Sequence, residues 1–213
     1  MDIYENFEGE REERKIIRHT YHYAYLAASL VMITLIIIDL ALHEWFTYCL
    51  WNFGLVYASS WTGRKLWDGA SSISDVKDDA CGSYKLYVES SCPGFCEHID
   101  NFIGAGGTML AFGIAAILFN LIAMGLVIWR MRHPSFRFEI ATLFFIMPTL
   151  QYFLAFIIFY GVAEIPELEE VHKIGNINPH EYGMAGGMIL AIVIIILQFS
   201  LMIYSLMVTR KAF

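Results

Sequence analysis

Residues 61–96 read WTGRKLWDGASSISDVKDDACGSYKLYVESSCPGFC, and they separate two of the most apolar segments of the chain. This stretch holds three of the four cysteines, two tryptophans and a run of acidic residues. It is therefore a polar, cysteine-containing loop bounded on both sides by strongly hydrophobic sequence. The nature of those flanking segments decides the fold.

The overall composition is that of a membrane protein. The 213 residues are 57% hydrophobic and only 16% charged, with a mean hydropathy of +0.53, whereas a soluble domain is about 45–50% apolar and about 25% charged. A helix crosses a bilayer with roughly 20 apolar residues, and four segments satisfy this length: 23–49, 102–129, 138–162 and 183–208. In hydrocarbon every backbone N–H and C=O needs a partner within the segment. The sequence therefore predicts an all-α membrane protein with a four-helix transmembrane bundle.

The basic residues predict the orientation of this bundle. Segments 1–22, 130–137 and 209–213 together carry nine Lys and Arg, and the long loops 50–101 and 163–182 carry five. Because Lys and Arg favour the cytoplasmic side, we expect both termini in the cytoplasm and both long loops outside. The first apolar segment is too long for a cleaved signal peptide, so we expect it to remain as an anchor. The plasma membrane is the expected location, with an internal organelle membrane as the alternative.

The two outer loops are acidic, with twelve Asp and Glu against five Lys and Arg. Asp75, Asp78 and Asp79 form the densest group of the first loop. One interpretation is a solvated face that keeps the protein soluble outside the bilayer. The other is a partner surface or vestibule that attracts cations.

All four cysteines lie on the outer side of this topology, which suits an oxidising compartment. The segment from Cys81 to Cys92 is typical of a short turn followed by a strand at 84–89, which favours a Cys81–Cys92 disulfide. Cys49 could then reach Cys96 as a second pair, or remain a buried free thiol. Four cysteines allow three pairings.

The sequence contains no recognisable catalytic constellation. Membrane oxidoreductases of the four-helix type need a reactive Cys-x-x-Cys pair, but here three residues separate Cys92 from Cys96 and the second loop has no cysteine. Metal-ligand spacing, a nucleophile elbow and a phosphate-binding loop are also absent from the sequence. We therefore expect no catalytic residue, no metal, no cofactor and no nucleic-acid partner.

Three ionisable residues lie close together near the outer end of the first segment. Asp39 is followed by His43 at the i, i+4 spacing and by Glu44. Ionisable groups within a span are candidates for function. They could pair with one another or meet water at the interface, or they could handle protons or ions.

Uncharged polar and small residues mark the expected helix contacts. Amides occur deep in each of the other three segments, at Asn120, Gln151 and Gln198, and such amides usually form hydrogen bonds between helices. Glycines at 104–107 and 183–187 allow close approach. Packing within the bundle is the first interpretation for these glycines, and a dimer face is the second.

This layout resembles the claudin superfamily, which includes the claudins, the peripheral myelin and epithelial membrane proteins, and gamma-type auxiliary subunits of channels and receptors. Its first outer loop carries a Trp, then Gly-Leu-Trp, then a disulfide-bonded cysteine pair. The matching positions are Trp51 (or Trp45), Gly63, Leu66, Trp67, Cys81 and Cys92. Two residues are inserted between Gly63 and Leu66, and the distance from Trp67 to Cys81 is longer than in the family.

The resemblance implies a small, disulfide-stapled antiparallel sheet in the first outer loop, with Leu66 and Trp67 buried where it meets the bundle. It also implies a non-catalytic structural or auxiliary subunit. Such a subunit would use its extracellular domain to associate with copies of itself or with other membrane proteins, at a cell junction or a channel. The C-terminal sequence VTRKAF has Lys211 two residues before its end, where a scaffold-tethered junction protein is expected to carry Ser or Thr. The alternative function is an oligomeric ion channel or transporter that uses Asp39, His43 and Glu44.

Overall fold

The computed structural model describes residues 2–42, 44–48, 51–60, 71–92, 94–133, 138–163 and 182–212. Its four long helices are α1 (Asp2–Ala41), α4 (Phe95–Arg132), α5 (Phe138–Val162) and α7 (Gly186–Ala212). Each contains a segment long and apolar enough to cross a membrane: Thr20–Ala41, Phe95–Arg132, Thr142–Val162 and Gly186–Met207. The prediction of four spanning-length helices is thus confirmed, and it indicates a multi-pass protein of a lipid bilayer.

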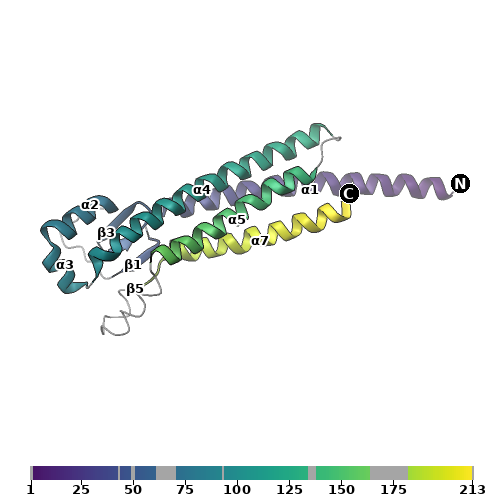
Figure 1. Ribbon diagram of the computed structural model, residues 1–213. Coiled ribbons are helices and arrows are strands. Elements are labelled where there is room, and N and C mark those ends of the chain that lie inside the picture. Colours follow the sequence, from purple (N-terminus) through teal and green to yellow (C-terminus); the bar gives the residue numbers. More distant parts are fainter. Residues whose placement is uncertain are drawn as a thin grey trace.

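The four helices form one elongated bundle (Figure 1). Each helix packs against two neighbours, in the cyclic order α1, α4, α5, α7. Helices α1 and α5 are therefore diagonal partners, and so are α4 and α7. The first residues of α1 extend past the other helices at the end of the bundle where α7 also terminates (Figure 1).

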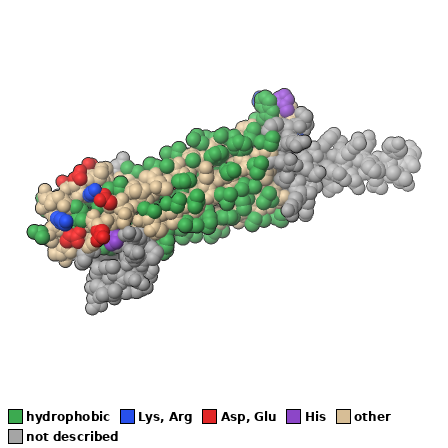
Figure 2. All heavy atoms as spheres, viewed as in Figure 1, with side chains coloured by type: hydrophobic (Ala, Val, Ile, Leu, Met, Phe, Trp, Pro, Cys, Tyr) green, Lys and Arg blue, Asp and Glu red, His purple; other side chains and the backbone are tan. Residues whose placement is uncertain are grey.

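Helix α4 buries a stripe of small residues and exposes large ones. On α4 the buried stripe includes Gly113, Ala116 and Ala123, whereas Leu118 and Leu121 are exposed. Small side chains let helix backbones approach closely where no hydrophobic effect drives them together. Hydrophobic side chains accordingly cover the outside of the shaft, and the visible acidic and most basic side chains gather at one end (Figure 2).

That end carries a five-stranded antiparallel sheet with the order β4-β3-β2-β1-β5. The strands are β1 (Phe46–Tyr48), β2 (Trp51–Phe53), β3 (Tyr57–Ser60), β4 (Ser71–Ser72) and β5 (Tyr182–Met184). We call this sheet, together with the short helices between β4 and α4, the head.

The resemblance implied a sheet made only of the first outer loop. The observed sheet extends beyond that loop. Helix α1 ends at Ala41, so residues 46–48 of the predicted span form β1 instead. α7 begins only at Gly186, so residues 183–184 of the fourth predicted span also form a strand, as part of β5, and Phe46 of β1 pairs with Phe53 on one side and Met184 on the other. Without β5, β1 would be an edge strand with unpaired backbone groups, so this pairing ties the start of α7 to the head.

Three short helical segments follow the sheet: α2 (Ile73–Asp78), the π-helical turn η1 (Asp79–Ser83) and α3 (Lys85–Ser91). The predicted strand at 84–89 is wrong, because this stretch is helical. Val88 N donates to Tyr84 O at 3.0 Å and Cys92 N donates to Val88 O at 2.7 Å. An alternation only six residues long cannot distinguish a strand from a short helix, and here Val88 is the buried side chain.

Helix α4 supplies the floor of the head. Phe95 and Phe102 lie two turns apart, so they share one helix face. The ring of Phe102 stacks on Phe53 at 5.1 Å and on Phe46 at 5.4 Å between centroids, and Phe95 lies 6.0 Å from Trp51. All five side chains are buried. This aromatic core holds the sheet on the bundle, since aromatic side chains bury the largest apolar areas.

Candidate functional site

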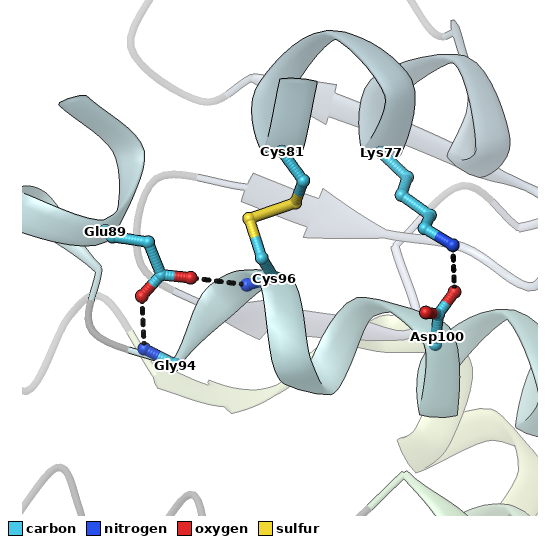
Figure 3. The surroundings of a disulfide bond; sticks show 6 residues. All are labelled: Lys77, Cys81, Glu89, Gly94, Cys96 and Asp100. Atoms are coloured by element: carbon cyan, nitrogen blue, oxygen red, sulfur yellow. Dashed lines mark hydrogen bonds and ion pairs between the residues drawn. A yellow bond between two sulfur atoms is a disulfide. The ribbon is translucent and has the colours of Figure 1, made fainter. Parts of the chain in front are cut away.

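A disulfide fixes the helical part of the head to the bundle. Cys81 in η1 is bonded to Cys96 in the first turn of α4, with their Cα atoms 5.6 Å apart (Figure 3). The predicted Cys81–Cys92 and Cys49–Cys96 pairs are therefore both wrong. The reason is the helical fold of residues 85–91, which brings the chain back so that Cys81 faces α4. Cys92 is buried and is also disulfide-bonded, and Cys49 lies outside the described residues.

The carboxylate of Glu89 caps the start of α4. The backbone N–H groups of Gly94 and Cys96 donate to its two oxygens at 2.8 and 3.0 Å (Figure 3). Gly94 has φ of +79°, a conformation that glycine adopts without steric cost. A carboxylate at a helix N-terminus also meets the positive end of the helix dipole. Glu89 therefore holds α3 against α4 beside the disulfide.

The acidic residues singled out in the sequence lie on the surface of the head. Asp75, Asp78 and Asp79 are exposed on α2 and η1. Lys77 of α2 forms an ion pair with Asp100 of α4 at 2.5 Å (Figure 3). Among the described residues no group of three His, Cys, Asp or Glu could hold a metal ion. The three aspartates are thus a solvated acidic face in this structure.

Helix α3 presents large apolar side chains to its surroundings. Leu86 is 90% exposed, Tyr87 is 52% exposed and Tyr84, at the N-terminal end of α3, is 41% exposed. We call these three residues the α3 patch. The disulfide and the Glu89 cap hold this patch in place, away from the apolar shaft of the helices.

Trp45 connects the head to three helices. Its indole Nε1 donates to the backbone oxygen of Asp39 at 2.9 Å, and its ring packs edge-on against Phe159 of α5 at 5.2 Å. Its backbone N–H donates to Phe53 O at 2.7 Å and its own oxygen accepts from Ala185 N at 3.1 Å. Trp45 is fully buried. It occupies the position where the head, α1, α5 and the start of α7 meet.

Two of the predicted close-packing glycines are needed at this junction. A Cβ on Gly187 would lie 2.5 Å from the Trp45 ring, and a Cβ on Gly106 would lie 2.2 Å from the backbone oxygen of Leu55. Packing within the protein is therefore the interpretation that the structure favours for these two. Gly104, Gly107 and Gly186 have open space around them.

The residues of the family signature are only partly described. Trp51 is buried on β2 and contacts the ring of Phe95. Gly63, Leu66 and Trp67 lie outside the described residues. Trp45, the second choice for the first Trp of the signature, is buried where the head meets the bundle.

The predicted cluster of Asp39, His43 and Glu44 does not form a continuous helical face. Helix α1 ends at Ala41, so the i, i+4 spacing does not extend to His43, which itself lies outside the described residues. Asp39 is fully buried, whereas Glu44 is exposed and accepts a hydrogen bond from Asn52 Nδ2 at 3.4 Å. The buried partner of Asp39 is the hydroxyl of Tyr152, which donates to Asp39 Oδ2.

Neither Tyr152 nor Glu89 was among the residues predicted from the sequence. Tyr152 had one signal, a phenol next to an amide near the middle of an otherwise apolar segment. Glu89 had no such signal, because its hydrogen bonds to Gly94 and Cys96 form only when α3 lies against the start of α4. Its charge also acts on Tyr48: burial first, and the negative charge of Glu89 second, raise the pKa of the Tyr48 hydroxyl above its ordinary value.

No protein-family model matches this chain, and no curated protein matches it either.

Proposed function

We propose that this chain is a non-catalytic four-span membrane protein that associates through its head with copies of itself or with another membrane protein. It would serve as a structural or auxiliary subunit of that assembly. The observation that carries the proposal is the α3 patch, because three large apolar side chains stand exposed on a segment fixed by covalent and charged contacts.

The α3 patch has the properties of a docking surface outside the bilayer. Large exposed apolar side chains gathered on one short segment indicate a candidate interaction site, and three of the four residues from 84 to 87 are of this kind. Aromatic residues are enriched at the centres of protein interfaces. The Cys81–Cys96 bond and the Glu89 cap order α3 before a partner arrives, and a preformed surface loses less conformational entropy on binding.

The charges around the α3 patch indicate the kind of partner. Asp75, Asp78 and Asp79 are exposed on the neighbouring α2 and η1. Acidic residues around an apolar contact attract basic residues at the edge of the partner's surface. This attraction guides the encounter of the two proteins and raises the association rate. The partner surface would therefore combine an apolar pocket with Lys or Arg at its edge.

We further propose that the chain is a member of the claudin superfamily. This proposal is supported by the five-stranded antiparallel sheet on a four-helix bundle and by a buried tryptophan at their junction. The cysteine pairing and the helix α3 depart from the family pattern quoted above. If the resemblance holds, the head faces the cell exterior, both termini are cytoplasmic, and the protein belongs to a junction or to a channel complex.

The alternative, an oligomeric channel or transporter that uses Asp39, His43 and Glu44, is less supported. Asp39 is buried among packed helices, and Glu44 is exposed at the head. These two carboxylates therefore do not line a common path in the described part of the chain.

The association is tested with one charge placed in the α3 patch. We would purify the protein from native membranes in mild detergent and measure its mass by native mass spectrometry and light scattering. Leu86→Glu should reduce the assembly to monomers, since it places a charge in a desolvated contact. Ser83→Glu adds the same charge at an exposed position on η1 and should leave the assembly intact. A wild-type protein that is monomeric at every concentration and without a stoichiometric partner would refute the proposal, as would an unchanged assembly in Leu86→Glu.

A further inference from the structure

A carboxyl group lies on the axis of the helix bundle. Asp39, two residues before the end of α1, is 0% exposed, and so is Tyr152 in the middle of α5. The Tyr152 hydroxyl donates a hydrogen bond to Asp39 Oδ2. Because α1 and α5 are diagonal helices, this hydrogen bond crosses the centre of the bundle.

The hydrogen bonds of Asp39 do not balance a negative charge. Its Oδ1 is buried and has no hydrogen-bond partner among the described residues. Its backbone oxygen accepts from Leu42 N at 3.2 Å and from Trp45 Nε1 at 2.9 Å, but neither donor reaches the carboxyl group. An ionised carboxylate has about four acceptor sites, and Tyr152 serves one of them.

Among the described side chains of the packed helices, no cation lies within ion-pair distance of this group. The sequence of α4 from 101 to 129 and that of α7 from 186 to 203 contain no titratable residue. The spanning part of α5 contributes the phenols Tyr152 and Tyr160. The adjoining head contributes the exposed Glu44 and the buried Tyr48, and His43 lies outside the described residues.

We propose that Asp39 and Tyr152 form a proton-binding site, in which Asp39 is a neutral carboxylic acid when the bundle is assembled. A buried carboxyl group without a cation or sufficient donors is far less costly neutral than charged. Ionisation would move one proton from the carboxyl group to bulk water. The carboxylate left behind would require water or a cation to enter the bundle.

The site is connected to the head through Trp45. This residue donates to the backbone oxygen of Asp39, pairs with Phe53 of β2 and accepts from Ala185 before α7. Hydration of an ionised Asp39 would displace the end of α1 and the indole bonded to it. Proton loss is therefore expected to weaken the contacts that Trp45 makes between the sheet and the helices. In this way the protonation state of Asp39 is linked to the position of the head.

The protonation state is measured by infrared difference spectroscopy on the full chain in nanodiscs of neutral lipid. We expect wild-type protein at neutral pH to show the carbonyl band of a neutral carboxylic acid, and Asp39→Asn to lack it. Asp78→Asn removes an exposed carboxyl group and should retain the band. Identical wild-type and Asp39→Asn spectra would overturn the proposal.

Two further measurements keep the test independent of how well Asp39→Asn folds. Carbon-13 labelling of aspartate should shift the band of the wild-type protein, and an unshifted band would overturn the assignment. Tyr152→Phe removes the hydroxyl that donates to Asp39 Oδ2, so the carbonyl band should move to higher frequency, because a carbonyl that loses a hydrogen bond absorbs at higher frequency. An unmoved band would show that Tyr152 is not part of the site. These outcomes do not depend on whether the head associates with a partner.

Discussion

Removal of the Cys81–Cys96 disulfide should open the helical part of the head locally. The bond joins residues separated by 15 positions and encloses α3. In the chain-entropy account a loop of that size contributes about 3 kcal/mol. The Glu89 cap and the buried Val88 remain in place when the bond is absent, so we expect local opening rather than loss of the fold.

Hydrogen exchange measures this opening directly. The double variant Cys81→Ser/Cys96→Ser should lose roughly a hundredfold of amide protection within α3, because 1.4 kcal/mol corresponds to a factor of about ten. The N–H groups of Val88 and Cys92 report it, since both donate within this segment. Amides in α5 serve as an internal reference and should not change.

The ion pair next to the disulfide provides a matched control. Lys77 and Asp100 keep 37% and 59% of their side chains exposed, and an exposed pair contributes at most about 1 kcal/mol. Lys77→Ala should therefore reduce protection of α3 by no more than roughly fivefold. If the double cysteine variant changes exchange no more than Lys77→Ala does, the disulfide does not hold α3 and the entropy argument is wrong.

Two other predictions concern the junction and the head. Gly187→Ala should destabilise the protein by about 1–3 kcal/mol, because the new methyl group would overlap the Trp45 ring. Thermal unfolding in detergent measures this loss. The control is Gly186→Ala, whose new methyl group meets nothing within 4 Å and should have no comparable effect. Tyr48 has a raised pKa when folded, so the folded state keeps its phenol proton after the unfolded chain has lost it, and stability should fall as pH rises above about 10 toward the folded pKa. Tyr48→Phe should flatten that decline, and an identical alkaline profile in the two proteins would contradict the assignment.

The helices were predictable because a bilayer acts on local composition. A run of apolar residues has to satisfy its own backbone wherever it crosses hydrocarbon, and this requirement involves no distant part of the chain. The third predicted segment, 138–162, coincides with α5. The first predicted segment extends eight residues beyond the end of α1, because Phe46 and Tyr48 have side chains that suit a span but their backbone pairs in the sheet.

The contacts that define the head and the buried site were not predictable in the same way. The bond of Cys81 to Cys96 depends on α3 being a helix, and a six-residue pattern does not decide between helix and strand. The Asp39–Tyr152 hydrogen bond joins residues 113 positions apart, and only the order of the helices around the bundle makes them diagonal partners. The sequence by itself determined which segments enter a membrane and that an acidic residue lies near the end of one of them. The tertiary structure alone decided what that residue contacts, because the relative positions of side chains from distant segments are not fixed until the helices have packed.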